Sequence, residues 1–428
     1  MVAVLFVLYL LSFVDRTVFA VLASAIQADL GLSDTQIGLA LGPAFTLSFA
    51  VFSVPLGWAA DRAPRRWVIF TGTAMWSLAT AATGLSRSFA MLMGSRAAVG
   101  LGEASLSPSA MSLLADKFPR ERLATALSVY QTAIYFGSGA AFALVAWVLG
   151  SIDAIRAAIP PFATLEPWRI TFLMLGLPGV LLGLLIFTVS EPKRRPDGRA
   201  VDAAPQGSEA FWRFLRDRRR LLTLLGLGFG LVAIVAYAIL AWIPTYMQRQ
   251  FGWTPVYFGP IISVIYLINA AALMLKGVGM DWLFRRGVED AHVRLYIWLL
   301  GLSTPAAVAL FLVEDPSWFI VLLAIVLIVL VPFMAFIMAA TQVFAPPGLR
   351  GRLTGAFLMV FGLFGATGPV VVGLLTDYVF QDEKRLGDAL LALTLGTIPL
   401  AVLSLCLALR PLRDAIAAVT GGGARAKT

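Results

Sequence analysis

Four charged residues interrupt apolar stretches that are otherwise long enough to cross a membrane. Asp15 and Arg16 lie in the first stretch, and Arg96 and Glu103 lie in the fourth. A charge at membrane depth costs about 2.5–3.5 kcal/mol even on a lenient insertion scale, so such residues face a cavity or pair with one another. The four side chains therefore indicate a polar wall inside a bundle of spanning helices.

The spacing of these residues predicts proton coupling. The rise of an α-helix places Asp15 and Arg96 at about the same depth, so we expect these two to pair. Glu103 lies on the same helix face as Arg96, about two turns away. A carboxylate beside a fixed arginine stays ionised, and it can take up a proton once the arginine moves or engages a substrate. We therefore predict that Asp15 and Glu103 carry protons and that Arg96 and Arg16 belong to the same site. A static ion network that fixes helix packing is the alternative.

The composition places these charges in a polytopic membrane protein. Of 428 residues, 59% are hydrophobic and 13% are charged, against about 25% charged in soluble proteins. This excludes a soluble enzyme, a disordered chain and a nucleic-acid binder. With one cysteine, Cys406, and one histidine, His292, the chain cannot build a disulfide framework or a histidine-rich metal site. We therefore expect no metal and no cofactor.

Twelve apolar runs are long enough to span a bilayer, which needs about 20 residues per helix. They cover residues 1–24, 36–60, 67–86, 89–115, 123–150, 168–190, 221–248, 257–280, 295–313, 318–345, 353–376 and 388–409. Lysine and arginine are concentrated in the tail and in the loops that follow even-numbered runs. By the positive-inside rule this distribution predicts that both termini are cytoplasmic and that the protein lies in the inner (plasma) membrane.

A polar stretch divides the chain into two halves. We predict one six-helix bundle over 1–190, a cytoplasmic linker over 191–220, a second bundle over 221–410 and a cytoplasmic tail over 411–428. The first part of the linker is rich in proline and glycine. Its second part, EAFWRFLRDRRR, sets aromatic residues against five arginines, which predicts a short amphipathic helix on the membrane surface. A solvated cationic loop is the alternative.

A duplicated motif, Gly-x-x-x-Asp-x-x-x-Arg-Arg, relates the two halves. It follows the second and the eighth run with identical spacing. We interpret it as a conformational latch, in which the carboxylate faces a helix N-terminus and the arginines meet lipid phosphates or other helix ends; plain positive-inside anchoring is the alternative. Lys276, beside the second copy, is expected to snorkel to the interface. The motif residues are Gly57, Asp61, Arg62, Arg65, Arg66, Gly277, Asp281, Arg285 and Arg286.

Two similar halves predict a cleft between them at the bilayer midplane. Polar and aromatic side chains in the spans are candidates for its lining, although some of them are equally explained as packing or interfacial residues. These candidates are Tyr130, Gln131, Tyr135, Tyr237, Trp242, Tyr266, Asn269 and Gln342.

The motifs resemble the major facilitator superfamily over essentially the whole chain. GWAADRAPRR is similar to its signature loop between helices two and three, although Pro64 stands where that pattern usually has glycine. FVDRTVFAVL in the first run and RAAVGLGEASLSPSAMSLLADKFP in the fourth resemble the spinster-like lipid transporters. The resemblance implies an all-α fold of twelve helices in two pseudo-symmetric bundles. It also implies proton-driven alternating access and a sphingolipid- or lysolipid-like cargo.

We therefore predict a proton-coupled secondary transporter of an amphipathic, lipid-like molecule, acting as a monomer among membrane lipids without a nucleic-acid partner. A proton-coupled organic-anion symporter of the same superfamily is the alternative, in which Arg96 would hold the substrate carboxylate. An intramembrane lipid-modifying enzyme is disfavoured because the chain has no G-x-S-x-G, no H-E-x-x-H and no intramembrane histidine. We expect no enzymatic activity.

Overall fold

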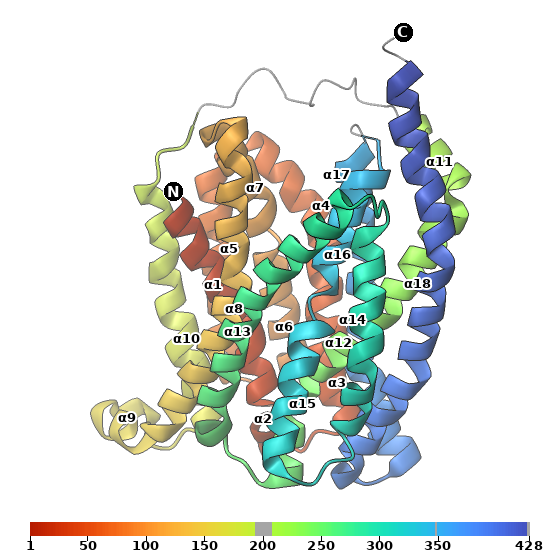
Figure 1. Ribbon diagram of the computed structural model, residues 1–428. Coiled ribbons are helices and arrows are strands. Elements are labelled where there is room, and N and C mark those ends of the chain that lie inside the picture. Colours follow the sequence, from red (N-terminus) through yellow and green to blue (C-terminus); the bar gives the residue numbers. More distant parts are fainter. Residues whose placement is uncertain (193–207, 347–348, 426–428) are drawn as a thin grey trace. The chain divides into compact units, whose positions relative to one another are not determined.

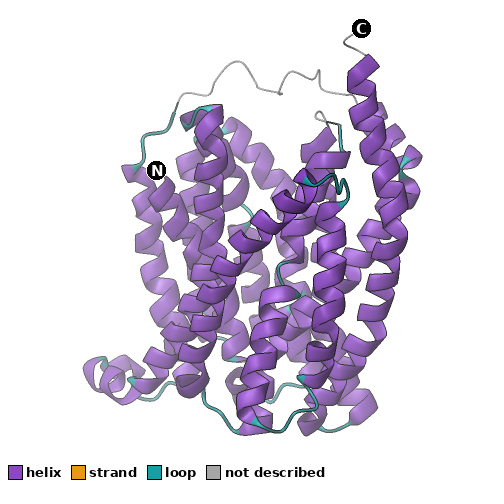
Figure 2. Ribbon diagram, viewed as in Figure 1, coloured by secondary structure: helices purple, strands orange, loops and turns teal. Residues whose placement is uncertain are grey.

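The computed structural model describes residues 1–192, 208–346 and 349–425, and all regular structure in these ranges is helical (Figures 1 and 2). The long helices of the first half are α1 (Val2–Val21), α2 (Ala23–Leu30), α3 (Asp34–Leu41), α4 (Pro43–Arg62), α5 (Arg65–Gly84), α6 (Phe89–Glu103), α7 (Leu106–Lys117), α8 (Arg120–Gly150), α9 (Ile152–Ala158) and α10 (Pro167–Gly183). The later ones are α11 (Ser208–Asp217), α12 (Arg219–Phe251), α13 (Pro255–Arg285), α14 (Ala291–Ala309), α15 (Pro316–Val329), α16 (Phe333–Phe344), α17 (Arg350–Leu374) and α18 (Leu386–Arg425). Short helices are η1 (Pro160–Phe162), η2 (Leu184–Thr188), the π-helix η4 (Leu375–Phe380) and η5 (Glu383–Arg385).

Several of these helices belong to candidate membrane spans. In the described part of the chain, nine helical segments are long and apolar enough to cross a membrane, which confirms the predicted all-helical membrane architecture. The other three predicted spans correspond to α5, α6 with α7, and α14, which fall outside this set. Small and polar residues such as Thr, Ser and Gly run through them, and in membrane proteins such residues occur where helices pack closely.

The fourth span of each half is interrupted near its middle. In the first half, α6 has 15 residues and α7 has 12, with a break at Ala104 and Ser105. In the second half, α15 has 14 residues and α16 has 12, with a break from Leu330 to Pro332. The two halves thus break the same helix at almost the same register.

By packing, the chain forms two compact units. Unit 1 holds residues 1–194, 239–270 and 369–386, and unit 2 holds 195–238, 271–368 and 387–428. Unit 1 therefore contains the first half together with parts of α12 and α13 and the segment that includes η4. This division groups residues by packing rather than by duplication, so the predicted halves 1–190 and 221–410 stay a prediction.

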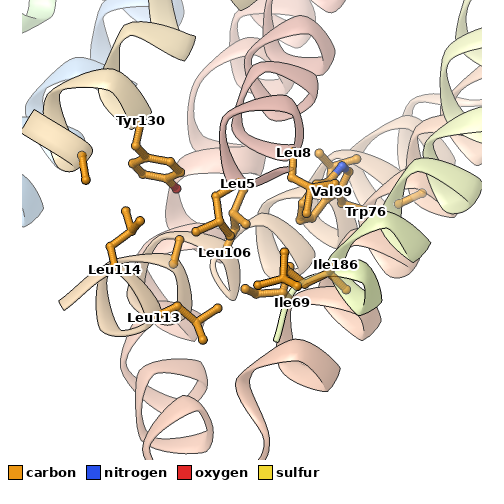
Figure 3. Packing of buried hydrophobic residues seen from close by; sticks show 14 of the residues in the cluster. Leu5, Leu8, Ile69, Trp76, Val99, Leu106, Leu113, Leu114, Tyr130 and Ile186 are labelled. Atoms are coloured by element: carbon orange, nitrogen blue, oxygen red, sulfur yellow. The ribbon is translucent and has the colours of Figure 1, made fainter. Parts of the chain in front are cut away.

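Unit 1 is held together by close helix contacts around an apolar cluster. α1 packs along α8, and α10 packs along α5 (Figure 1). Leu5 and Leu8 of α1 and Trp76 of α5 are fully buried in this cluster (Figure 3). A Cβ on Gly137 of α8 would lie 2.6 Å from the Leu10 carbonyl oxygen of α1, so a larger residue there would push the two helices apart. This packing fixes α1, which carries Asp15 and Arg16.

Unit 2 has its own aromatic core. The Phe229 ring lies 5.3 Å from Tyr296 and 6.2 Å from Phe361, and the Tyr296 ring lies 4.9 Å from Phe336. Offset and tilted aromatic pairs of this kind add to the free energy gained by burial. The cluster joins α12, α14, α16 and α17.

The predicted linker is partly described. Its second part forms α11, as expected, with Trp212 exposed, and its location on a membrane surface stays a prediction. Its first part, over residues 193–207, lies outside the described residues. Residues 411–425 of the predicted tail continue α18, and Leu412, Ala415 and Ile416 are buried along it.

Candidate functional site

Glu103 is the centre of a buried ion pair in unit 1. It is 2% exposed, and its Oε2 accepts hydrogen bonds from Arg16 Nε at 2.6 Å and from Ser12 Oγ at 2.6 Å. Arg16 Nη2 also lies 2.6 Å from Oε2. Charge-assisted contacts of this length are among the strongest hydrogen bonds in proteins. The pair connects α1 to α6 directly before the break in the fourth span.

Three phenylalanine rings enclose the Arg16 guanidinium. Its Cζ lies 4.8 Å from the Phe13 ring centroid, 4.5 Å from Phe45 and 5.2 Å from Phe49. Cation–π contacts at these distances stabilise a cation that has lost water. Sequence reasoning had placed Arg16 in the site without a defined partner; the structure assigns Glu103 as that partner.

Asp15 is buried without an ion pair. It is 2% exposed, and Oδ1 has no hydrogen-bond partner. Arg96 donates instead to the Ala40 carbonyl oxygen at 3.5 Å, and its Cζ lies 4.4 Å from the Phe19 ring centroid. The predicted Asp15–Arg96 pair is therefore wrong for this conformation. Among the described residues, no ion pair and no hydrogen bond joins the two side chains. Phe19 lies one helical turn beyond Asp15, and its ring stacks with the Arg96 guanidinium.

The two carboxyl groups thus have different surroundings. Glu103 Oε2 is held by a cation and a hydroxyl while its Oε1 has no hydrogen-bond partner, whereas Asp15 forms no ion pair and its Oδ1 is unpartnered. A buried polar atom without a partner costs free energy, and proton binding removes the charge of such a carboxyl group. Asp15 is the group of this site that can change its protonation state without breaking an ion pair.

A second polar network joins helices of the first half to later segments of unit 1. Arg249 of α12 donates to both carboxylate oxygens of Asp34, at 2.8 and 2.7 Å, and to Gln27 Oε1 at 2.9 Å. Asp34 is 0% exposed. Asp377 accepts from the backbone N–H groups of Asp34 at 3.2 Å and Thr35 at 2.7 Å, so its carboxylate caps the positive N-terminus of α3.

Sequence reasoning missed this network. Asp34 follows Ser33, whose side chain forms a capping box with Gln36, so the start of a helix could have been read from the sequence. The pairing with Arg249, 215 positions later, has no local signal.

The first copy of the duplicated motif surrounds a buried arginine. Arg65 is 1% exposed and contacts Asp116, Ser112 Oγ at 2.9 Å and Glu191 Oε1 at 3.3 Å, and its backbone N–H donates to the same glutamate oxygen at 2.7 Å. Burial alone would raise the pKa of Glu191, but the hydrogen bonds and charge of Arg65 outweigh it and hold that pKa below its ordinary value. Arg66 Nε lies 3.4 Å from Glu191 as well.

The other residues of this copy are only partly described. Arg62 stacks on Trp58, with Cζ 4.0 Å from the ring centroid. Around Gly57 there is room for a larger residue, since its nearest neighbour would be 3.9 Å from an added Cβ. The side chain of Asp61 lies outside the described residues, so its role as a latch stays a prediction.

The second copy of the motif has different contacts. Asp281, Arg285 and Arg286 are exposed; Arg285 Nε donates to the Asp281 backbone oxygen at 3.3 Å, and Arg286 stacks on the Trp282 ring at 3.9 Å. No carboxylate pairs with these arginines among the described residues. In unit 2 the buried carboxylate is Asp290, which binds Arg294 at 2.9 Å and Arg413 at 3.2 Å.

The candidate cleft residues are distributed over both units. In unit 1, Tyr130 stacks on Tyr9 with 4.4 Å between centroids, and Trp242 Nε1 donates to the Pro369 carbonyl oxygen at 3.0 Å. Two of the candidates belong to unit 2, namely Tyr237 and Gln342. The buried candidates are Tyr130, Trp242, Tyr266 and Asn269. The exposed ones are Gln131 and Gln342, and the half-buried ones are Tyr135 and Tyr237. A common cleft lined by these residues stays a prediction.

A chain of membrane-spanning helices with a buried charge cluster beside an interrupted helix defines a multi-pass membrane protein of the transporter class. Comparison with known families agrees. Residues 5–413 match the model of the Major Facilitator Superfamily, and the chain belongs to this family.

Relatives with described roles are transporters of several kinds. The chain is 29% identical over 402 residues to an MFS-type efflux pump of Mycolicibacterium smegmatis, covering 92% of this chain and 88% of the pump. It is 25% identical over 397 residues to a D-galactonate transporter of Escherichia coli O6:H1, covering 87% and 88%. It is 31% identical over 261 residues to human protein spinster homolog 1, covering 59% of this chain and 47% of that protein.

Solved structures support the fold. A bacterial homologue of the human lysosomal transporter Spinster, in an inward-facing and unoccupied conformation, superimposes with a TM-score of 0.81 at 22% identity, covering 96% of each chain. At this identity the likeness shows the fold alone.

Proposed function

We propose that this transporter is a proton-coupled secondary transporter that moves an amphipathic, lipid-like molecule of sphingolipid or lysolipid type by alternating access. The observation that carries the proposal is Asp15, a buried carboxyl group with an unpartnered oxygen beside a fixed Glu103–Arg16 pair. The lipid-like cargo follows from the resemblance of the first and fourth runs to the spinster-like lipid transporters, and the chain is similar to human protein spinster homolog 1.

Charge balance connects the proton to the cargo. When ionised, Asp15 and Glu103 offset the two guanidinium groups of Arg16 and Arg96, and a proton on Asp15 leaves one positive charge in excess. That excess favours an anionic group of the cargo, and by linkage the bound anion favours the proton to the same extent. The Glu103–Arg16 pair keeps the helices around Asp15 in place during this step.

A second candidate is a proton-coupled organic-anion symporter. It is supported by the D-galactonate transporter relative and by the same charge balance, with Arg96 as a contact for a carboxylate. An intramembrane lipid-modifying enzyme is not proposed, and hydrolysis of a labelled lipid by the pure protein would revive it.

We also propose that both termini are cytoplasmic in an inner (plasma) membrane, following the distribution of Lys and Arg, and that the protein works as a monomer. In that orientation the Arg249–Asp34 network faces outward. A single cysteine placed at exposed Arg286, in a Cys406→Ser background, tests the orientation with an impermeant thiol reagent: reaction in intact cells would overturn it.

Uptake into proteoliposomes tests the function. A panel of lysophospholipids, sphingosine-type lipids and sugar acids is offered with and without an imposed pH gradient. The proposal expects gradient-driven accumulation of a lipid by the wild-type protein and none by Asp15→Asn. Accumulation of sugar acids alone would favour the organic-anion symporter, and uptake that ignores the pH gradient would overturn proton coupling.

A further inference from the structure

Lys276 is a cation of unit 2 that the proton-coupling site does not use. It lies in α13, nine residues before that helix ends at Arg285, so its Cα is about 14 Å from the helix end. Leu275 and Val278 of the same helix are 73% and 62% exposed, whereas Met280 is 7% exposed. Lys276 itself is half-buried.

The Lys276 side chain turns into unit 2 instead of snorkelling to the interface as expected from the sequence. Its Nζ donates to the backbone carbonyl of Ile328. In an unbroken helix this carbonyl would accept from the amide of residue 332. That residue is Pro332, which has no N–H, so the carbonyl lacks a helical donor. Beside it, the Tyr296 hydroxyl donates to the Leu330 carbonyl oxygen at 2.9 Å.

The break that Lys276 binds lies near the middle of a membrane span. Ile328 is the thirteenth residue of the 29-residue span Pro316–Phe344. In the first half the corresponding span breaks at Ala104, directly after Glu103. Interrupted hydrophobic segments at corresponding positions of two halves point to the substrate site of a transporter built from repeats. Beside the break, the first half therefore has an acid of the broken helix itself, Glu103, and the second half has Lys276, which reaches the broken helix from α13.

The charge of Lys276 is not balanced within the described chain. The contact that its Nζ makes is with a backbone carbonyl, and no described carboxylate forms an ion pair with it. A charge at this depth is costly unless it faces a cavity or finds a counter-charge. A Cβ built on the adjacent Gly277 meets no atom within 4 Å, so α13 is not packed against another element at that position.

We propose that Lys276 binds the anionic group of the cargo, a carboxylate or a phosphate, at the break between α15 and α16. The proposal deepens the proposed function and rests on it. A lysine that served only to hold the broken helix could be replaced by another hydrogen-bond donor, whereas an anion site needs the positive charge. This difference separates the two roles in an experiment.

The experiment measures binding to the purified full-length chain with two matched pairs of probes. Lysophosphatidic acid and monoacylglycerol differ by the phosphate, and D-galactonate and D-galactose differ in the carboxylate. Lys276→Gln removes the charge and keeps a donor, Lys276→Arg keeps the charge, and Arg213→Gln makes the same charge change at an exposed position of unit 2 outside the latch motif.

We expect the wild-type protein to prefer the anionic member of at least one pair. Lys276→Gln should weaken that binding tenfold or more and leave the neutral member unchanged, whereas Lys276→Arg and Arg213→Gln should stay within about threefold of wild type. The lipid pair and the sugar pair distinguish the two sources of the anion.

Two results would overturn the proposal. One is an unchanged anion preference in folded Lys276→Gln. The other is wild-type binding without any preference for the anion, which would leave proton-coupled transport of a neutral cargo standing. If Lys276→Gln does not fold, reductive methylation of the wild-type protein gives the answer by peptide mass spectrometry. Lysophosphatidic acid or D-galactonate should then protect Lys276, and failure of both to protect it counts against the site.

Discussion

Replacing Arg249 by methionine should make local opening of unit 1 around α3 more frequent, because Arg249 binds Asp34 at the start of that helix. The change keeps the length and the apolar stem of the side chain but leaves the Asp34 carboxylate buried without its cation. Asp34 is 0% exposed and the Arg249 side chain is 14% exposed, so this is a buried pair in which removal of one partner costs about 3–5 kcal/mol. Even the lower value corresponds to a shift of about a hundredfold in an opening equilibrium.

Hydrogen exchange of the backbone amides measures that opening directly. In Arg249→Met we expect faster exchange, by up to about a hundredfold, in the segments 33–41 and 375–386. The contacts of Asp377 with the amides of Asp34 and Thr35, and of Arg249 with Asp34 and the Glu383 backbone oxygen, join these two segments. Exchange in α5 and α10 should stay as in wild type, because their packing does not involve Arg249. The local nature of the effect distinguishes it from global destabilisation.

A matched control lies in the same unit. Arg169 pairs with Asp29 at 2.6 Å, and its side chain is also 14% exposed, but this pair joins α10 to the end of α2 within the first half. Arg169→Met should therefore leave the exchange of 375–386 unchanged. The double variant Asp34→Asn with Arg249→Met removes both charges and should recover part of the protection. Wild-type exchange at 33–41 and 375–386 in folded Arg249→Met would refute the reasoning.

Three further changes test the charge clusters. Asp15→Asn mimics the protonated carboxyl group and should abolish accumulation driven by a pH gradient, while cargo binding stays within about threefold of wild type. Transport and binding measured on the same preparation check this, with the exposed Asp153→Asn as control. Accumulation at the wild-type rate would contradict the role given to Asp15. Glu103→Gln removes the partner of Arg16 and should give a milder loss with a shifted pH dependence, so a pH–rate profile identical to wild type would contradict it. Glu191 has a lowered pKa when folded, so its contribution to stability is present above its ordinary pKa of 4.5 and is lost as pH falls through the folded value. Glu191→Gln should then reduce stability at pH 7 by about 1 kcal/mol, and thermal unfolding should show this difference shrinking below pH 4.5; a difference that grows in acid would have the wrong sign.

The helical architecture and the burial of the four charges could be predicted from the sequence. Long apolar runs broken by Asp15, Arg16, Arg96 and Glu103 leave few other interpretations, because a charge in lipid must face protein or water. The partners of these charges could not be predicted in the same way. The position along a helix predicts which Cα atoms lie at the same depth in the membrane. An arginine side chain is long enough to reach a partner at a different depth.

Arg16 and Arg96 show the effect of that reach. Arg16 turns to Glu103 on α6, with three aromatic rings around it, and Arg96 turns to the Phe19 ring. Rotamer choice depends on rings that come from α1 and α4, so it follows from the packing and has no signature in spacing. The Arg249–Asp34 pair, which links positions 215 apart, belongs to the same class of contact.

The breaks in the fourth spans show what duplication preserves and what it does not. The helix break recurs at the same register, with a 12-residue helix after it in each half, whereas the charges beside it differ. In the first half an acid of the broken helix is bound by Arg16 from α1; in the second half the Ile328 carbonyl, just before the break, accepts a hydrogen bond from Lys276 of α13. Under the proposed function, the acid beside the first break would serve the proton and the lysine beside the second would serve the cargo anion, so one recurring helix break would give the protein two chemically different ligand sites, and coupling would be the free energy that links them.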